Sequence, residues 1–202
     1  TDCGGGHRYS LSGSSRRTAT DYASKISAYV INTGLDLYSN FTYFMDDPIN
    51  GDQFSQPDRR VTSGLNASHT WHSHLNGKNT DFTIGTQLQN DNIFNGLHKT
   101  KARQQLSTVR QDHIVESSLG LYVDVSTRWT ESFRTNFGVR HDQYRFQVDG
   151  DRRENSGKAN DHITSPSASL IFGPWSKTEL YVNLGTGFHS NDARATLTTI
   201  DP

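Results

Sequence analysis

Hydrophobic and polar residues alternate with a period of two along much of this chain, and the alternation is clearest between residues 112 and 142. In the first half of that segment most odd positions are apolar, namely Val115, Leu119, Leu121, Val123, Val125 and Trp129. After a short link at 130–132 the pattern restarts with Phe133, Phe137 and Val139. Because side chains of a strand point alternately to its two faces, this pattern predicts two β-strands, each with an apolar and a hydrophilic face.

The hydrophilic face of these two strands carries full charges of both signs. Glu116, Asp124 and Arg128 are on the first strand, and Arg134 and Arg140 are on the second. A charged face suits a water-filled lumen, and an apolar face that ends in an aromatic residue beside the turn suits lipid. Both features are typical of outer-membrane β-barrels. A soluble β-sandwich is the alternative, but it requires the apolar faces to pack together.

The same reasoning along the whole chain predicts eight strands, which we expect at about 7–14, 25–37, 60–71, 79–91, 112–129, 133–142, 165–172 and 178–187. Short turns near 16–23, 72–79, 130–132 and 173–177 alternate with long hydrophilic loops near 39–58, 92–111, 149–161 and from 188. We therefore predict an all-β fold in which residues 1–202 form part of one antiparallel transmembrane β-barrel, with the short turns periplasmic and the long loops extracellular. Trp71, Trp129 and Trp175 all lie at or beside short turns, as in an interfacial aromatic girdle.

Composition agrees with a barrel better than with a soluble domain. Hydrophobic residues make up only 32% of the 202 residues, and the mean hydropathy is -0.74. A net charge of -1 gives no sign of a nucleic-acid partner. The chain contains no apolar run of about 18 residues, so no transmembrane helix is expected.

No signal peptide is visible at Thr1, so we expect a mature chain, a fragment or a protein that is not exported. Cys3 is the only cysteine, and it cannot form an internal disulfide alone.

One stretch near the C-terminus resembles a known family. Residues 178–194 read TELYVNLGTGFHSNDAR. This segment is similar to a strand that TonB-dependent outer-membrane receptors carry in mid-barrel. Ser165-Pro166 and the FGPW turn at 172–175 resemble the hairpin that precedes that strand, and residues 35–60 resemble an extracellular loop of the family.

The resemblance implies an interior slice of a larger barrel of about 22 strands in the bacterial outer membrane. The family has glycine where this chain has Ala195, and its plug domain, TonB box and terminal aromatic residue are not found here. The implied function is import of a scarce solute, such as an iron chelate, another metal complex, a vitamin or a sugar. The implied partners are outer-membrane lipid, lipopolysaccharide and the TonB complex, which acts through a plug domain that is not in this chain.

Two other function classes stay open at this point. A barrel enzyme acting on lipid or peptide would require a Ser-His-Asp set at one height on the wall, and no strand shows one convincingly. A structural or adhesive barrel would require no site at all. We expect no enzymatic activity and no cofactor.

The candidate ligand-binding residues lie in the predicted extracellular loops. Aromatic residues stand beside acids in the first loop, His98 and Arg103 lie in a basic second loop, and further polar residues follow the last strand. The full set is Phe41, Tyr43, Phe44, Asp46, Asp47, His98, Arg103, His189, Asp192 and Arg194. Aromatic side chains next to acids suit a ligand of mixed character, and the basic loop suits an anionic ligand or lipopolysaccharide phosphates. The alternatives are loop packing for the aromatics and simple solvation for the charges.

Metal binding is the remaining candidate chemistry. His72 and His74 share one face of a predicted strand, which is a spacing that can chelate a divalent ion. The turn beside them belongs to the predicted periplasmic end, where an external ligand does not arrive. We therefore expect solvated turn residues there and no metal site.

Overall fold

The computed structural model describes residues 3–187, which form one sheet of eight antiparallel strands, each hydrogen-bonded to the next in the sequence. The strands are β1 (Cys3–Thr18), β2 (Tyr22–Ser39), β3 (Phe54–Leu75), β4 (Lys78–Lys101), β5 (Gln104–Thr130), β6 (Phe133–Gly150), β7 (Gly157–Trp175) and β8 (Thr178–Gly185). A single 3₁₀ turn, η1 (Arg153–Asn155), lies between β6 and β7. Within residues 3–187 no helix has the length and hydrophobicity needed to span a bilayer.

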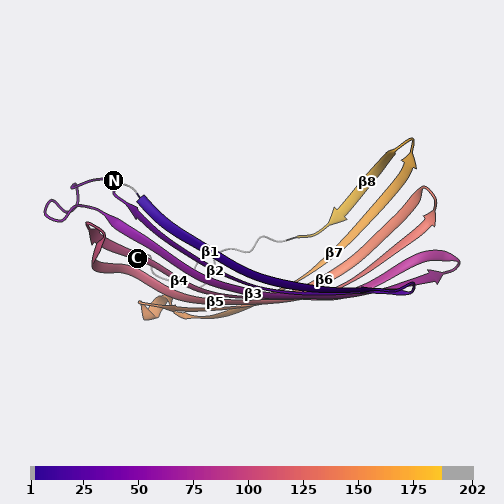
Figure 1. Ribbon diagram of the computed structural model, residues 1–202, viewed down its shortest axis with the longest axis horizontal. Coiled ribbons are helices and arrows are strands. Elements are labelled where there is room, and N and C mark those ends of the chain that lie inside the picture. The colour runs from indigo at the N-terminus through magenta and orange to yellow at the C-terminus, as the bar shows by residue number, and fades with distance from the viewer. Residues whose placement is uncertain (1–2, 188–202) are drawn as a thin grey trace.

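The sheet is open and strongly curved, and its connections separate into two ends (Figure 1). The tight turns after β1, β3, β5 and β7 lie at one end, and the β2–β3 loop and the connections after β4 and β6 lie at the other. The prediction of an all-β antiparallel fold is confirmed. The turn that follows β3 consists of Asn76 and Gly77, both with positive φ, which is the preferred chemistry of a two-residue hairpin.

Strand register gives the sheet one apolar surface over the half nearest the tight turns. Apolar residues of neighbouring strands stand directly opposite one another, as in Leu88–Leu119, Ile84–Val123, Phe82–Val125, Val123–Val139 and Val125–Phe137. We call this side the outer face, because its apolar side chains are left uncovered, Leu121 being 52% and Phe137 51% exposed. Glu116 and Arg134 fall on the opposite side, which we call the inner face.

The strands are longer than the sequence pattern predicted, and two of the predicted long loops are wrong. Residues 92–101 continue β4 and residues 104–111 begin β5, so the loop predicted near 92–111 is a two-residue turn. The loop predicted near 149–161 shrinks to residues 151–156, because β6 ends at Gly150 and β7 begins at Gly157.

The physical reason is that the polarity of the two faces exchanges partway along β2, β4, β5 and β6. On β2 the apolar residues Ile26, Ala28 and Val30 lie on the outer face, but Leu35 and Leu37 lie on the inner face. A window that crosses the exchange loses its period-two signal and looks like a polar loop.

The exchange places a small apolar cluster on the inner face in the half nearest the long loop. Ile93, Ile114 and Val148 are only 5%, 3% and 3% exposed, and Phe146 packs against them. The outer face at the same level is mainly hydrophilic, with Arg59 and Asp36 in an ion pair at 2.7 Å, although Phe94 stands opposite Arg59. A wall that leaves lipid and continues into water requires this arrangement, since apolar side chains then gain by turning inward.

Aromatic residues gather where the apolar band ends beside the tight turns. Trp71 packs against Phe82 with 5.6 Å between ring centroids, and Phe133 stacks on Phe172 at 5.1 Å. The Nε1–H of Trp129 donates to Thr135 Oγ1 at 2.8 Å, which satisfies the polar end of that ring. An amphipathic ring with a satisfied donor is stable at a membrane–water boundary.

A charge introduced on the outer face tests this assignment. Val123 lies between Ile84 and Val139 near the middle of the apolar band. Val123→Arg should lower the free energy of unfolding in lipid vesicles by about 2–4 kcal/mol, since arginine at the bilayer midplane is poorly solvated. The control is Ser126→Arg on the inner face of the same strand, where Asp81 stands opposite. Equal stability of the two variants would contradict the assignment of the faces.

Candidate functional site

The inner face carries a hydrogen-bond network that ties together strands that are not adjacent. The Tyr29 hydroxyl of β2 donates to Gln89 Oε1 of β4 at 3.2 Å, and the Gln89 side-chain amide donates to Asp91 at 2.7 Å. Thr62 of β3 donates to the other oxygen of Asp91. These contacts satisfy a carboxylate that is 8% exposed, which is the condition under which a buried charge is tolerated.

A second group of charges lies further along the same face. Arg140 of β6 donates two hydrogen bonds to Asp142, at 2.6 and 2.7 Å, and a third to Gln87 Oε1 of β4 at 2.7 Å. Arg134 of β6 pairs with Glu179 of β8 at 2.7 Å. Bidentate arginine–carboxylate pairs hold both side chains in one orientation, so Arg140 and Asp142 are fixed in place on this wall.

Glycines make these crossings possible. Tyr29 reaches Gln89 by lying over Gly64, where a Cβ would stand 2.4 Å from the tyrosine Cζ. Arg140 likewise passes over Gly120, where a Cβ would stand 2.2 Å from Nη2. A glycine in a strand often marks such a close approach, and here each one lets a long side chain bridge a strand.

Substitution of a bridged glycine tests this role. Gly64→Ala should displace the Tyr29 ring, break its bond to Gln89 and lower the free energy of unfolding by about 1–3 kcal/mol. The matched control is Gly13→Ala on β1, because no atom lies within 4 Å of a Cβ built there. Denaturant unfolding in detergent would compare the stability of the two variants. An equal effect of both would show that the close approach of Tyr29 to Gly64 does not contribute to stability.

The β2–β3 loop, residues 40–53, has an internal framework built from carboxylates. The Asp52 carboxylate accepts the backbone N–H groups of Met45, Asp46 and Asp47 at 2.8, 3.1 and 2.8 Å. The Asp47 carboxylate accepts the N–H groups of Ile49 and Asn50 at 3.0 and 2.9 Å. Aspartates that bond to nearby backbone amides are ordinary turn chemistry, so these two acids order the loop.

The ordered loop is fixed to the turn between β4 and β5. The Thr100 N–H donates to the Gln53 carbonyl oxygen at 2.8 Å, and the Arg103 N–H donates to Gln53 Oε1 at 3.0 Å. The Lys101 ammonium donates to the Ile49 carbonyl oxygen at 3.1 Å. The β2–β3 loop and the β4–β5 turn, about fifty residues apart in sequence, are thereby held together at this end of the sheet, and we call them the rim.

A pocket of about 450 Å³ lies between this loop and the inner face of the strands beneath it. The loop contributes Phe41, Asp46, Asp47, Asp52 and Gln53, and the strands contribute Phe54, Gln56, Leu97, Lys99 and Val109. Leu97 and Lys99 are in phase with Ile93 on β4, which places them on the inner face. The lining therefore combines carbon-rich side chains with one ammonium group and several carboxylates, and we call it the rim pocket.

The structure distributes the predicted ligand-binding residues unevenly. Phe41, Asp46 and Asp47 line the rim pocket. Tyr43 and Phe44 do not line it and remain 67% and 59% exposed. The predicted role of these five residues in ligand binding stays a prediction.

The remaining predicted residues lie elsewhere. His98 is buried on the opposite side of β4 from Lys99, across from Ser55. The Arg103 guanidinium lies 5.9 Å from the centroid of the Tyr38 ring. The positions His189, Asp192 and Arg194 fall outside the described residues.

Nine of the lining residues were not among the sequence candidates, and they include Gln53, Gln56, Leu97 and Val109. Leu97 was not selected because it was assigned to a predicted loop. An extended β4 would have placed its side chain on the same face as that of Ile93. Val109 lies at an irregularity where the β4–β5 register shifts, and such a bulge leaves no mark on composition.

Of the histidines near the tight turn after β3, two make side-chain hydrogen bonds. His72, one of the predicted pair, contacts Asp81 at 2.8 Å on the inner face, while His69, on the outer face, contacts Ser24 at 2.7 Å. Within residues 3–187 no three His, Cys, Asp or Glu side chains converge as metal ligands do.

Hydrogen bonding in the loop changes the acidity of its two structural carboxylates. The backbone and side-chain amides of Asn50 hold the pKa of Asp47 below its usual range, and Lys99 adds to the effect. Desolvation raises the pKa of Asp52, but hydrogen bonds from several groups, including the Asp46 amide, outweigh it and the net pKa is lowered. The folded loop thus favours both carboxylates in their charged form.

This shift makes the order of the loop depend on pH. The stabilisation is complete above the unfolded aspartate pKa of about 3.9, and it is lost as pH falls through the lower values of the folded loop. Hydrogen exchange of the Met45, Asp46 and Asp47 amides, corrected for intrinsic rates, should show constant protection at neutral pH and loss below about pH 4. Asp52→Asn should lower protection at neutral pH, and wild-type protection that persists unchanged at pH 2 would contradict the framework.

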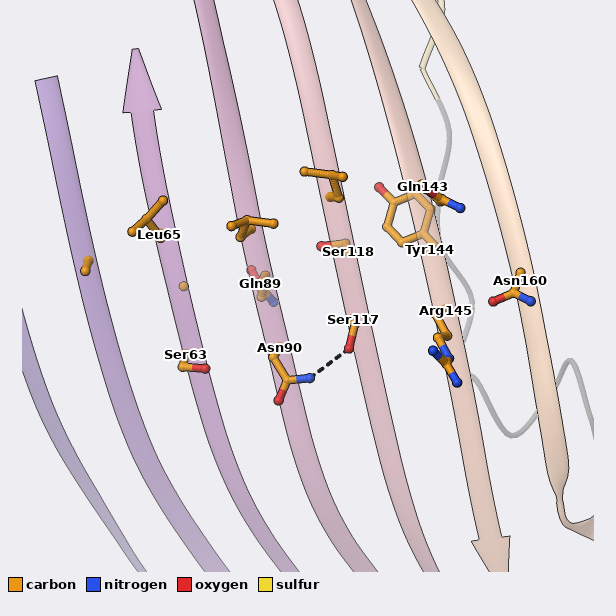
Figure 2. A pocket seen from close by; sticks show the side chains of 14 residues that line it. Ser63, Leu65, Gln89, Asn90, Ser117, Ser118, Gln143, Tyr144, Arg145 and Asn160 are labelled. Carbon is orange, nitrogen blue, oxygen red and sulfur yellow. Dashed lines mark hydrogen bonds between the residues drawn. The ribbon is translucent and has the colours of Figure 1, made fainter. Parts of the chain in front are cut away.

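Two larger hollows lie on the outer face of the sheet. One, of about 850 Å³, is lined by Leu65, Leu88, Leu119, Arg145 and Asn160 among others (Figure 2). The second, of about 760 Å³, is lined by Val123, Val139, Ala168 and Leu184 among others. Both sit on the side that carries the apolar band, so neither opens toward the inner face.

The fold and its two faces define an outer-membrane β-barrel wall, and comparison with known proteins gives the family. A family model described as "TonB dependent receptor-like, beta-barrel" matches residues 4–199. The chain belongs to this family of TonB-dependent receptor barrels, which confirms the resemblance seen in residues 178–194. The protein is accordingly part of the bacterial outer membrane. No curated protein sequence matches the chain.

Solved structures of the same architecture support the fold. The ferric citrate transporter FecA, unliganded, superposes with a TM-score of 0.76 at 12% identity, over 89% of this chain and 27% of its own. The copper transporter OprC gives 0.67 at 16% identity, over 88% and 29%. The ferric yersiniabactin uptake receptor FyuA from Yersinia pestis gives 0.61 at 15% identity, over 87% and 27%. The chain thus spans less than a third of each of these proteins.

Proposed function

We propose that this chain forms part of the barrel wall and of the extracellular solute-binding vestibule of a TonB-dependent receptor that imports a scarce solute. The solute classes that fit are an iron chelate, another metal complex, a vitamin or a sugar. The receptor acts as a transporter and not as an enzyme. Support comes from the family and from structural neighbours whose names describe transport or uptake.

The observation that carries the proposal is the position and lining of the rim pocket. It lies on the inner face at the end of the sheet that bears the long loop, where an external solute enters a barrel. Phe41, Phe54 and Leu97 offer apolar contact, while Lys99 and Asp46 offer charge. A few polar groups within a mainly apolar lining are typical of small-molecule sites.

The carboxylates of the pocket are not equally available to a solute. Asp47 and Asp52 are engaged by backbone amides of their own loop. Lys99 projects on the inner face across from Phe54. An organic solute with both apolar surface and anionic groups therefore fits this lining better than a bare cation does.

The coupling of transport to energy lies outside this chain in the proposed mechanism. The barrel wall binds outer-membrane lipid, and a plug domain contacted by the inner-membrane TonB complex releases the solute inward. The described strands contribute to this cycle a rigid wall, through the Tyr29 and Arg140 crossings, and an ordered rim, through Asp47 and Asp52.

Uptake by cells tests the proposal directly. A strain that expresses the protein should take up at least one labelled solute from a panel of ferric citrate, a ferric hydroxamate, cobalamin and a maltooligosaccharide. Uptake should require both the protein and TonB. Absence of TonB-dependent uptake for every compound, with the protein present in the outer membrane, would contradict import of these solute classes.

Variants of the rim pocket then test the site. Phe41→Ala and Lys99→Glu should each weaken binding of the imported solute by about tenfold, as expected for the loss of one good apolar or charged contact. Arg153→Ala in η1 is the control, because this residue lies outside the rim pocket. Equal binding by all three variants would leave the barrel assignment intact and reject this pocket.

A further inference from the structure

The charged residues of the inner face are unevenly distributed between two parts of the sheet. The described inner positions of β1, β2 and β3 hold one carboxylate, that of Asp58, which stands 3.9 Å from an arginine near the long-loop end. The same positions hold four arginine and lysine side chains, namely Arg8, Arg16, Lys25 and Arg60. Most acids of the inner face are on β4 to β8, among them Asp91, Glu116, Asp124 and Asp142. An anion on this face is therefore favoured beside β1 to β3.

Two of these cations face each other directly. The register of the β1–β2 hairpin pairs Arg16 with Lys25, and both residues are exposed. Among residues 3–187 neither side chain has an ion-pair or hydrogen-bond partner, in contrast to Arg134 and Arg140, which pair with carboxylates of the same wall. Like charges directly opposite one another destabilise an antiparallel strand pair. A bound anion between the two side chains would offset this repulsion.

Neutral hydrogen-bond donors surround the two cations. Ser14 and Ser27 stand opposite each other at the next inner position toward the long-loop end. Ser68 of β3 stands directly opposite Lys25. The neighbouring inner positions of β1, β2 and β3 hold no acid within the described part of the chain. A guanidinium, an ammonium and hydroxyl groups on one surface are the donors that a phosphate or carboxylate group requires.

The register places these donors within the length of strand that carries the apolar band. The row that contains Lys25 continues through Ser68 and Gly85 to Tyr122. Gly85 follows Ile84, which belongs to the apolar band on the outer face. The Tyr122 ring lies over Gly85, which brings a further hydroxyl donor toward Ser68. The two cations therefore lie between the rim pocket and the tight turns, in a wall backed by lipid, where charge interactions are stronger than in bulk water.

These features point to one kind of ligand. We propose that Arg16 and Lys25 form a second anion-binding site, which holds a phosphate or polycarboxylate group of the imported solute after it leaves the rim pocket. The guanidinium and the ammonium bind the oxyanion from two strands, and the hydroxyls of Ser14, Ser27 and Ser68 complete its hydrogen bonds. The role in import rests on the proposed function, which the site refines by favouring an anionic solute over a neutral sugar. Binding of the anion itself is measurable without transport.

Thermal unfolding of the complete receptor in detergent at low ionic strength tests the site. In chloride alone, Lys25→Ser should raise the midpoint temperature, because it removes the repulsion between directly opposed like charges. Phosphate or citrate, compared with chloride at equal ionic strength, should raise the midpoint of the wild type and leave that of Lys25→Ser nearly unchanged. Lys25→Arg keeps the charge, so it should respond to both anions as the wild type does.

Equilibrium binding of radiolabelled inorganic phosphate gives the size of the effect. Lys25→Ser and Arg16→Ser should each weaken binding about tenfold, as expected for the loss of one charge-assisted contact. Arg17→Ser is the matched control, because Arg17 is the next residue along β1 but lies on the outer face, 5.8 Å from the centroid of the Tyr22 ring. Its phosphate binding should equal that of the wild type.

Three outcomes would overturn the site. In the first, phosphate and citrate stabilise the wild type no more than chloride does. In the second, Arg17→Ser loses as much phosphate binding as Lys25→Ser. In the third, Lys25→Ser is less stable than the wild type and the wild type does not respond to phosphate, which would indicate that an acidic side chain of the receptor already occupies the site. Intact phosphate binding without uptake of any solute would reject the proposed function alone, and intact uptake without phosphate binding would reject this site alone.

Discussion

The rest of this structure depends on the ladder of backbone hydrogen bonds that joins each strand to the next. A strand in lipid has no water to satisfy its amides and carbonyls, so every one of those groups has to find a partner in a neighbouring strand. The ladder from β1 to β8 meets that requirement for the interior strands. Once the backbone is satisfied in this way, the side chains on the two faces are free to match two different solvents.

The exchange of polarity along the strands follows from that freedom. The same β4 carries Leu88 outward in the band and Ile93 inward beyond it, because its surroundings change from lipid to water over about five residues. The alternation of apolar and polar residues predicted the strands well where the same face stays apolar throughout, as from Leu119 to Val125. It failed near 92–111 because the apolar residues there lie on the opposite face of the strand. A search that assumes one apolar face along the whole strand does not recognise such a segment.

The candidate site was less predictable than the fold for a related reason. Phe41, Asp46 and Asp47 could be selected because aromatics beside acids are conspicuous in a loop. Leu97 and Val109 could not, since their place depends on the register of β4 against β5 and on a bulge. The carboxylates also show the limit of composition. Asp47 and Asp52 are turn-forming groups whose partners are backbone amides, and residue type alone does not distinguish that role from ligand binding.

The height of the rim pocket above the membrane constrains how transport can work. The apolar band of the outer face includes Leu88 on β4, and Lys99 lines the pocket eleven residues further along. At about 3.3 Å per residue this separation is roughly 35 Å along the strand. In the proposed function, a solute held there lies outside the plane of the bilayer, so capture and passage would be separate steps. Near the level of Leu88 the polar inner wall is braced by Arg140 and Tyr29 across glycines, and in the proposed function this part of the wall stays fixed while another part of the receptor moves. A rigid wall with an ordered rim suits a receptor in which the moving part is a plug and the barrel stays fixed.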